Sequence, residues 1–226
     1  MILVEACVTS ARSAQAAQAA GVGRIELCAR ITRDGLTPAA RTVAATRAAT
    51  NLPIRIMLRP HDRGYVYDVR ARRALLDGVA LARAHGVEGV VVGCLTPGHV
   101  VDADLLSDVI ACARPLKVTF HRAFDLVRDP AAALDSLIRL GVDDALTSGG
   151  ESTALSGAKV LRRLERQADG RIRIVAAGRI RAANARAIVA ATRVRAVHAH
   201  TNAPGFRDLV RVLGDVGASS GIAPPD

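Results

Sequence analysis

Eight short apolar runs alternate with longer Ala-, Leu- and Arg-rich stretches along this chain of 226 residues. The runs start roughly 22 to 35 residues apart, which is the spacing that one strand, one helix and two short loops require. Such alternation favours a parallel sheet covered by helices. The expected strands are residues 2–7, 24–28, 54–58, 89–93, 116–120, 144–147, 172–177 and 195–199.

Residues typical of helix ends separate these runs. A Ser, Thr or Asp side chain caps the first turn of a helix, and a proline fits that turn because no amide hydrogen is needed there. A glycine commonly ends a helix in the left-handed conformation. These signals predict N-caps at Thr9 or Ser10, Asp102 and Asp129, first-turn prolines at Pro38 and Pro130, and C-terminal glycines at Gly21, Gly86 and Gly141.

Eight parallel units can close into a barrel or form an open, doubly wound sheet. No Gly-rich nucleotide fingerprint follows the first expected strand, so we expect no nucleotide cofactor, and the open sheet is the weaker interpretation. The even spacing favours closure. We therefore predict one α/β domain, a single (β/α)8 barrel of the TIM type, in residues 1–214. The eighth helix is expected to be shortened, at about 206–213, and a flexible tail is expected in residues 215–226.

The net charge of +10 raises the question of nucleic acid binding. Nearly all of the positive charge is arginine, which is scattered along the chain without a basic run. Aromatic residues that could stack on bases make up only 2% of the chain. These features argue against a nucleic acid partner and leave attraction of small anions open.

No run approaches the roughly 18 apolar residues of a membrane span, and Glu5 comes too early for a secretory signal. We therefore expect a cytoplasmic protein without a membrane partner. In that compartment its four cysteines would be reduced thiols. Cys94 and Cys112 are expected to pack in the core, because free cysteine is among the most buried residue types.

Active sites of such barrels lie at the C-terminal ends of the strands. Two matched Glu-x-Cys units end the first two expected strands, Glu5 with Cys7 and Glu26 with Cys28. Residues two apart in a strand share a face, so two carboxylates and two thiols would converge if these faces point inward. The alternatives are carboxylates that only tie the barrel together and thiols that only fill space. The expected partners of the carboxylates are Arg59, Arg122 or Lys117.

The most polar strand end is residues 119–125, which contain His121, Arg122 and Asp125. His121 could act as a general acid or base, ligate a soft metal or be purely structural. Arg59, Arg122 and Asp125 are candidates for holding an anionic substrate.

Two further strand ends carry candidate binding groups. The turn Ser148-Gly149-Gly150 offers backbone N–H groups suited to phosphate or carboxylate, unless it is an ordinary tight turn. The last expected strand carries His198, a further candidate for substrate binding, and His200.

Several of these pieces resemble the CutC family, whose members are called copper homeostasis proteins. The resemblance extends to about residue 202. It implies a cytosolic β/α barrel, often a homo-oligomer, with a proposed Cu(I) role for Cys7 and Cys28, and soft thiolates do select Cu(I). The matching pieces are Val4-Glu5-Ala6-Cys7, Arg24-Ile25-Glu26-Leu27-Cys28, Gly35-Leu36-Thr37-Pro38, Arg59-Pro60, Val118-Thr119-Phe120-His121-Arg122-Ala123-Phe124-Asp125 and Leu146-Thr147-Ser148-Gly149.

The sequence departs from the family pattern in three places, one of which is a short C-terminal extension. His61-Asp62-Arg63-Gly64-Tyr65 stands where the family usually has Arg-Gly-Gly-Asp-Phe, and His200 stands where Ser is expected.

Two functions are therefore open. One is Cu(I) binding in copper homeostasis, with Cys7 and Cys28 as ligands. The other is an enzyme of unknown reaction that acts on a small anionic or phosphorylated metabolite. In the enzyme Glu5, Glu26 and His121 would handle protons, because ionisable groups are dense at the expected mouth.

Overall fold

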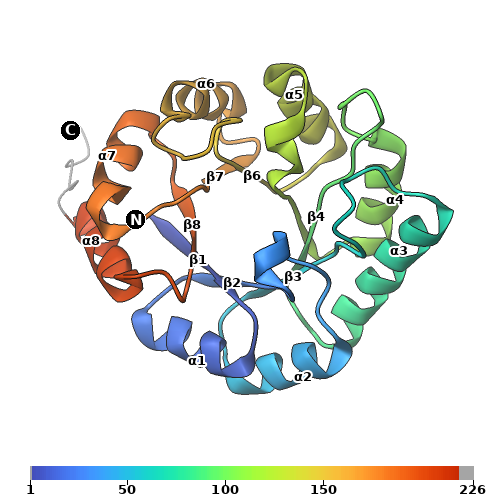
Figure 1. Ribbon diagram of the computed structural model, residues 1–226, viewed down its shortest axis with the longest axis horizontal. Helices are drawn as coiled ribbons and strands as arrows, with labels where there is room; N and C mark the ends of the chain where they lie inside the picture. Colours follow the sequence, from blue (N-terminus) through green and yellow to red (C-terminus); the bar gives the residue numbers. More distant parts are fainter. Residues whose placement is uncertain (1, 219–226) are drawn as a thin grey trace, which may run out of the picture.

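The computed structural model describes residues 2–218, so most of the predicted tail, residues 219–226, lies outside the described residues. Eight parallel strands close into a barrel, since β1 pairs with both β2 and β8. Figure 1 shows the strands at the centre and the helices as an outer ring. The strands are β1 (Leu3–Val8), β2 (Arg24–Leu27), β3 (Ile54–Met57), β4 (Gly89–Val92), β5 (Lys117–Phe120), β6 (Asp144–Thr147), β7 (Arg173–Ala176) and β8 (Ala196–His200).

A helix follows each strand. Two short 3-10 turns, η1 (Ile31–Arg33) and η2 (Arg122–Leu126), lie in the loops after β2 and β5. The predicted barrel is thus confirmed, and every predicted strand boundary lies within one residue of the observed one. The helices are α1 (Ala11–Ala20), α2 (Ala40–Ala49), α3 (Val69–Ala84), α4 (Ala103–Ala113), α5 (Pro130–Leu140), α6 (Ala158–Ala168), α7 (Ala182–Thr192) and α8 (Phe206–Ala218).

Side-chain caps fix the helix ends largely as predicted. Ser10 accepts from the backbone N–H of Ser13 at the start of α1, and Asp102 caps α4 in the same way. The start of α5 combines the Asp129 cap with Pro130 in the first turn. The prediction for Pro38 is wrong, because α2 begins only at Ala40. The N–H of neighbouring Thr37 donates to the Arg59 carbonyl, which ties this segment to the end of β3 and delays the helix.

The eighth helix is longer than expected. It runs from Phe206 to Ala218, 13 residues, and so includes the start of the segment predicted as tail. Gly214 suggested that the helix ends there, but a glycine inside a helix lowers stability by only about 1 kcal/mol relative to alanine. Burial of Phe206, Leu209 and Leu213 against the barrel outweighs that cost.

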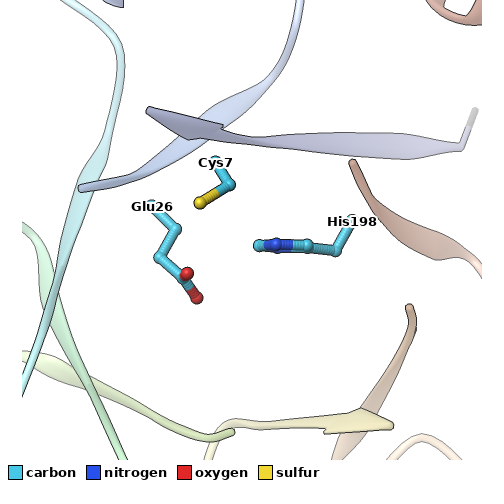
Figure 2. Close-up of side chains that lie close together, drawn as sticks. All are labelled: Cys7, Glu26 and His198. Atoms are coloured by element: carbon cyan, nitrogen blue, oxygen red, sulfur yellow. The ribbon is translucent and has the colours of Figure 1, made fainter. Parts of the chain in front are cut away.

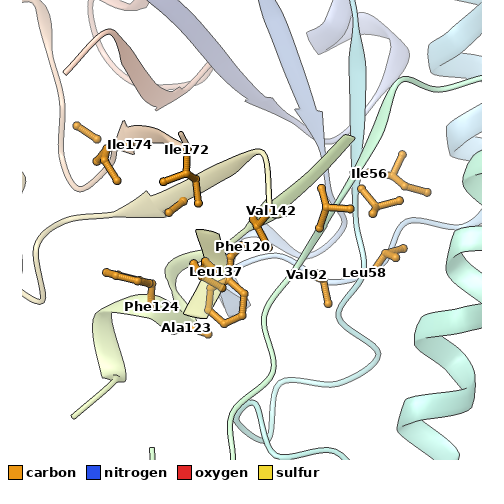
Figure 3. Close-up of a cluster of buried hydrophobic side chains, with 14 of the residues drawn as sticks. Ile56, Leu58, Val92, Phe120, Ala123, Phe124, Leu137, Val142, Ile172 and Ile174 are labelled. Carbon is orange, nitrogen blue, oxygen red and sulfur yellow. The ribbon is translucent and has the colours of Figure 1, made fainter. Parts of the chain in front are cut away.

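The main hydrophobic core lies between the barrel and the helices. Side chains on the outward faces of the strands, such as Phe120 and Ile174, pack against helix residues such as Leu137. Figure 3 shows this layer around β5, where Phe120 and Phe124 fill the space beside α5. The prediction that Cys112 packs in the core is wrong, because its side chain is exposed, whereas Cys94 is buried as expected. Cys112 lies at the edge of the buried stripe of α4.

Charged side chains fill part of the barrel interior, below the mouth. Asp144 accepts from Arg24 at 3.1 Å and also pairs with Arg55, which in turn donates to Thr119. Arg24 reaches Glu5 at 2.5 Å. A buried charge is tolerated only when it is paired, and here strands β1, β2, β3, β5 and β6 supply the partners. This ion-pair network lies inside the barrel, directly below the C-terminal ends of the strands.

Candidate functional site

A cavity of about 530 Å³ opens at the C-terminal ends of the strands. In Figure 1 the turn η1, drawn in blue, lies inside the ring of helices near β3. Its Ile31 lines the cavity. Most of the predicted site residues meet here. Those that line the cavity are Cys7, Glu26, Cys28, His121, Arg122, Asp125 and His198.

The two thiols lie against each other, as the matched Glu-x-Cys units predicted. Cys7 lies one residue before the end of β1, Cys28 directly follows β2, and their Sγ atoms are 3.5 Å apart. Both side chains are buried. The hydrogen bond with Cys28 and burial both raise the pKa of Cys7 well above its ordinary value. Cys7 is therefore held as a thiol until a ligand displaces its proton.

Glu5 lies one layer below the cavity and is fully ionised. It accepts from Arg24 and, at 2.8 Å, from Nδ1 of His198. Burial alone would raise its pKa, but the charge of Arg24 and the hydrogen bond from His198 outweigh burial and lower the pKa to about 2. Because the carboxylate only accepts, Nδ1 of His198 carries the hydrogen. Burial alone would lower the pKa of His198, but the charge of Glu26 and the hydrogen bond to Glu5 outweigh burial and raise it. Nε2 therefore has a free lone pair only after the imidazolium has lost a proton.

A sulfur, a carboxylate and an imidazole converge beside the thiol pair. One ligand atom each from Cys7, Glu26 and His198 lies within 4.8 Å of the others. Figure 2 shows the three side chains directed into one common space from β1, β2 and β8. Oε2 of Glu26 is buried and has no hydrogen-bond partner among the described residues. Burial raises the pKa of Glu26 to about 7.

His121 is held as a neutral ring. Its Nδ1 accepts from the backbone N–H of Ala123 at 3.1 Å, which caps the turn η2. Burial and then the nearby charge of Arg59 lower its pKa to about 3. The ring of Tyr65 lies 5.0 Å from the imidazole. A group that stays neutral at pH 7 is poorly suited to the proton transfer expected from the sequence.

The Ser148–Gly150 turn wraps around a side chain of the protein itself. The backbone N–H groups of Ser148 and Gly150 donate to Oδ1 of Asp125 at 2.9 and 3.1 Å. The N–H of Gly149 donates to Thr147. Asp125 thus occupies the position that the sequence suggested for an external anion, and the turn does not line the cavity.

The residues expected to pair the two glutamates point elsewhere. Arg59 donates to the carbonyls of Arg33 and Gly35, and its guanidinium lies 4.9 Å from the centre of the Tyr65 ring. Arg122 pairs with Asp125 at 2.8 Å. Lys117 starts β5 at the opposite end of the barrel and pairs with Asp143.

The actual partner, Arg24, was missed by the sequence analysis. The available signal was the alternation Arg24-x-Glu26-x-Cys28, which places the arginine on the same inward face as the carboxylate and the thiol. Arg181, a cationic residue of the mouth, was also missed; it lines the cavity from the segment between β7 and α7, together with Arg179.

The fold and the site together define a class of protein: a closed eight-stranded β/α barrel with thiol, carboxylate and imidazole groups gathered at its C-terminal mouth. No helix within residues 2–218 is long and apolar enough to cross a membrane.

Comparisons with known proteins agree with this class of protein and identify one family within it. The family model described as the CutC family matches residues 2–203. The copper homeostasis protein cutC homolog of Mus musculus is 38% identical over 206 residues, which cover 91% of this chain and 75% of that protein. The crystal structure of CutC from Streptococcus agalactiae superposes with a TM-score of 0.84 at 25% identity, covering 89% of this chain and 99% of that one. The thiamine phosphate pyrophosphorylase of Pyrococcus furiosus shares the fold alone, with a TM-score of 0.65 at 15% identity over 96% of each chain.

The chain belongs to the CutC family and is a homolog of its copper homeostasis proteins.

Proposed function

We propose that this chain binds Cu(I) at the mouth of the barrel through the sulfurs of Cys7 and Cys28. The observation that carries the proposal is the contact of two buried thiols, with Sγ atoms 3.5 Å apart at the ends of neighbouring strands. Soft thiolates select Cu(I) over harder divalent ions. From the family resemblance we also propose that the protein works in the cytoplasm as a homo-oligomer.

His198 supports the same metal as a third donor. Its Nδ1 donates to Glu5, so the metal would bind at Nε2 and displace the proton that the raised pKa of His198 favours there. A carboxylate behind a ligating histidine fixes the ring and its tautomer, and loss of such an outer partner typically costs 10–100-fold in metal affinity. The role of Glu5 in this proposal is positioning, not proton transfer.

Glu26 is compatible with a cation at this point. Its carboxyl group is buried and partly neutral near pH 7, since burial raises its pKa to about 7. A cation bound beside it would stabilise the charged form and compensate for the unpaired Oε2. Binding must also release a proton from Cys7, so affinity should increase with pH.

An anaerobic competition titration with a Cu(I) chelator tests the proposal on the reduced protein. The double variant Cys7→Ala/Cys28→Ala should bind Cu(I) more than about a hundredfold more weakly than the wild type. Loss of a residue that only supports a metal ligand already costs up to about a hundredfold in metal affinity, and here the ligands themselves are removed. Cys94→Ala is the matched control, because Cys94 is also buried but does not line the cavity. Equal affinity of the double variant and the wild type would refute the thiol site.

A second candidate function rests on the size of the cavity. About 530 Å³ is far more than one ion needs and lies in the range of small-molecule sites. An enzyme acting on a small anionic metabolite would use Glu26, whose pKa of about 7 suits a general acid or base. Native mass spectrometry of the purified protein, with Glu26→Gln beside it, tests whether a small acid is retained.

A further inference from the structure

His121 presents one particular hydrogen-bond donor at the mouth. Its Nδ1 accepts from the backbone N–H of Ala123, so the hydrogen of the neutral ring resides on Nε2. The hydrogen bond from Ala123 fixes this tautomer in a residue that is only 4% exposed.

That donor has no partner. Nε2 of His121 is buried and makes no hydrogen bond to any described residue. Leaving a buried N–H unpaired is unfavourable, and such groups in native proteins generally pair with water or a ligand. The imidazole lines the cavity of about 530 Å³, which is where such a partner would lie.

Neighbouring residues hold the His121 ring in a fixed orientation. Gly93, which directly follows β4, lies against it, and a Cβ at this position would overlap the imidazole. The Tyr65 ring flanks it at 5.0 Å. A donor held in this way is already oriented, so a ligand would not have to order it.

The charges around the cavity favour an anionic acceptor. Arg179 and Arg181 line it, whereas the charge of Arg122 and that of Asp125 compensate each other in an ion pair. The remaining acids of the lining are Asp34 and Glu26.

We propose that the mouth holds a small organic oxyanion, a carboxylate or a phosphate ester, one oxygen of which accepts the Nε2 hydrogen of His121. This inference rests on the second candidate function and is independent of the copper site. His121 then acts as a fixed neutral donor that orients and polarises an oxygen, in place of the acid–base role predicted from the sequence. Arg179 and Arg181 at the edge of the cavity attract the anion electrostatically.

The test uses metal-free full-length protein and three probes: pyruvate, glycolate and inorganic phosphate, each at about 10 mM, which saturates a site of millimolar affinity. Calorimetry gives the affinity, and NMR of histidine-labelled protein follows the Nε2 hydrogen of His121. In the variant His121→Asn, the amide oxygen can still accept from Ala123, but the outward donor is lost. His85→Asn, on the C-cap of α3 and outside the cavity, is the matched control.

We expect at least one probe to shift the His121 resonance and to bind about ten- to a hundredfold more weakly to His121→Asn, with His85→Asn unchanged. Preference for pyruvate and glycolate over phosphate identifies a carboxylate ligand, and the reverse preference identifies a phosphate. Equal binding to His121→Asn overturns the proposal. An unshifted resonance in the wild type with all three probes also overturns it, because Nε2 then donates only to buried water. Neither result bears on Cu(I) binding by the two cysteines.

Discussion

The substitution Glu5→Gln should destabilise the protein by an amount that depends on pH. In the folded state Arg24 and His198 lower the pKa of Glu5 from 4.5 to about 2 against the opposing effect of burial. The difference of about 2.5 pH units, at about 1.36 kcal/mol each, corresponds to roughly 3 kcal/mol of stability at pH 7. The side chain is fully buried, so solvent does not screen this contribution.

The direction of the pH effect follows from the lowered pKa. The ionised carboxylate stabilises the fold fully above the unfolded pKa of 4.5, and this contribution is lost as the pH falls through about 2. The difference in unfolding free energy between wild type and Glu5→Gln should therefore decrease from about 3 kcal/mol at pH 7 to about 2 kcal/mol at pH 3.5.

Urea unfolding at both pH values, followed by circular dichroism, measures this difference. Glu151→Gln is the matched control, because Glu151 is exposed and an exposed substitution should change stability by no more than about 0.5 kcal/mol. A penalty below about 1 kcal/mol at pH 7, or one that is the same at both pH values, would refute the assigned role of Glu5.

Two further predictions concern other parts of the structure. Gly93→Ala should lower the free energy of unfolding by about 1–3 kcal/mol, because the added methyl overlaps His121. At Gly98 the added methyl makes only an ordinary contact with the Thr96 hydroxyl, so Gly98→Ala should be nearly neutral; urea unfolding of both variants checks this. A thiol reagent added to the native protein should modify Cys112 quickly and the other three cysteines slowly, and Cys112→Ser should abolish the fast phase. A fast phase that survives the substitution would contradict the burial of the remaining thiols.

The barrel was predictable because its signals are local. Apolar runs, capping side chains and glycines at helix ends each depend on a few neighbouring residues, and they agreed along the whole chain. The meeting of Cys7 and Cys28 was predictable for a related reason: period-two alternation places both on inward faces of adjacent strands, and the structure brings their sulfurs into contact.

The partners of charged groups were not predictable in the same way. Which arginine reaches Glu5 depends on the stagger of neighbouring strands, which sets Arg24 opposite Glu5 in the pairing of β1 with β2. Arg59 donates to the backbone carbonyls of Arg33 and Gly35 because the loop between β2 and α2 passes beside it. The conformation of that loop cannot be deduced from a local sequence pattern. The Ser148–Gly150 turn was a plausible anion site until the structure placed Asp125 inside it.

Copper K-edge X-ray absorption of the Cu(I)-loaded, reduced protein tests the central proposal most directly. The account predicts two sulfur scatterers, from Cys7 and Cys28, with a nitrogen contribution from His198 that weakens in Glu5→Gln. The single variant Cys28→Ser should lose one sulfur from the shell. A shell of nitrogen and oxygen alone, or a sulfur shell unchanged in Cys28→Ser, would contradict a copper site at the buried thiol pair.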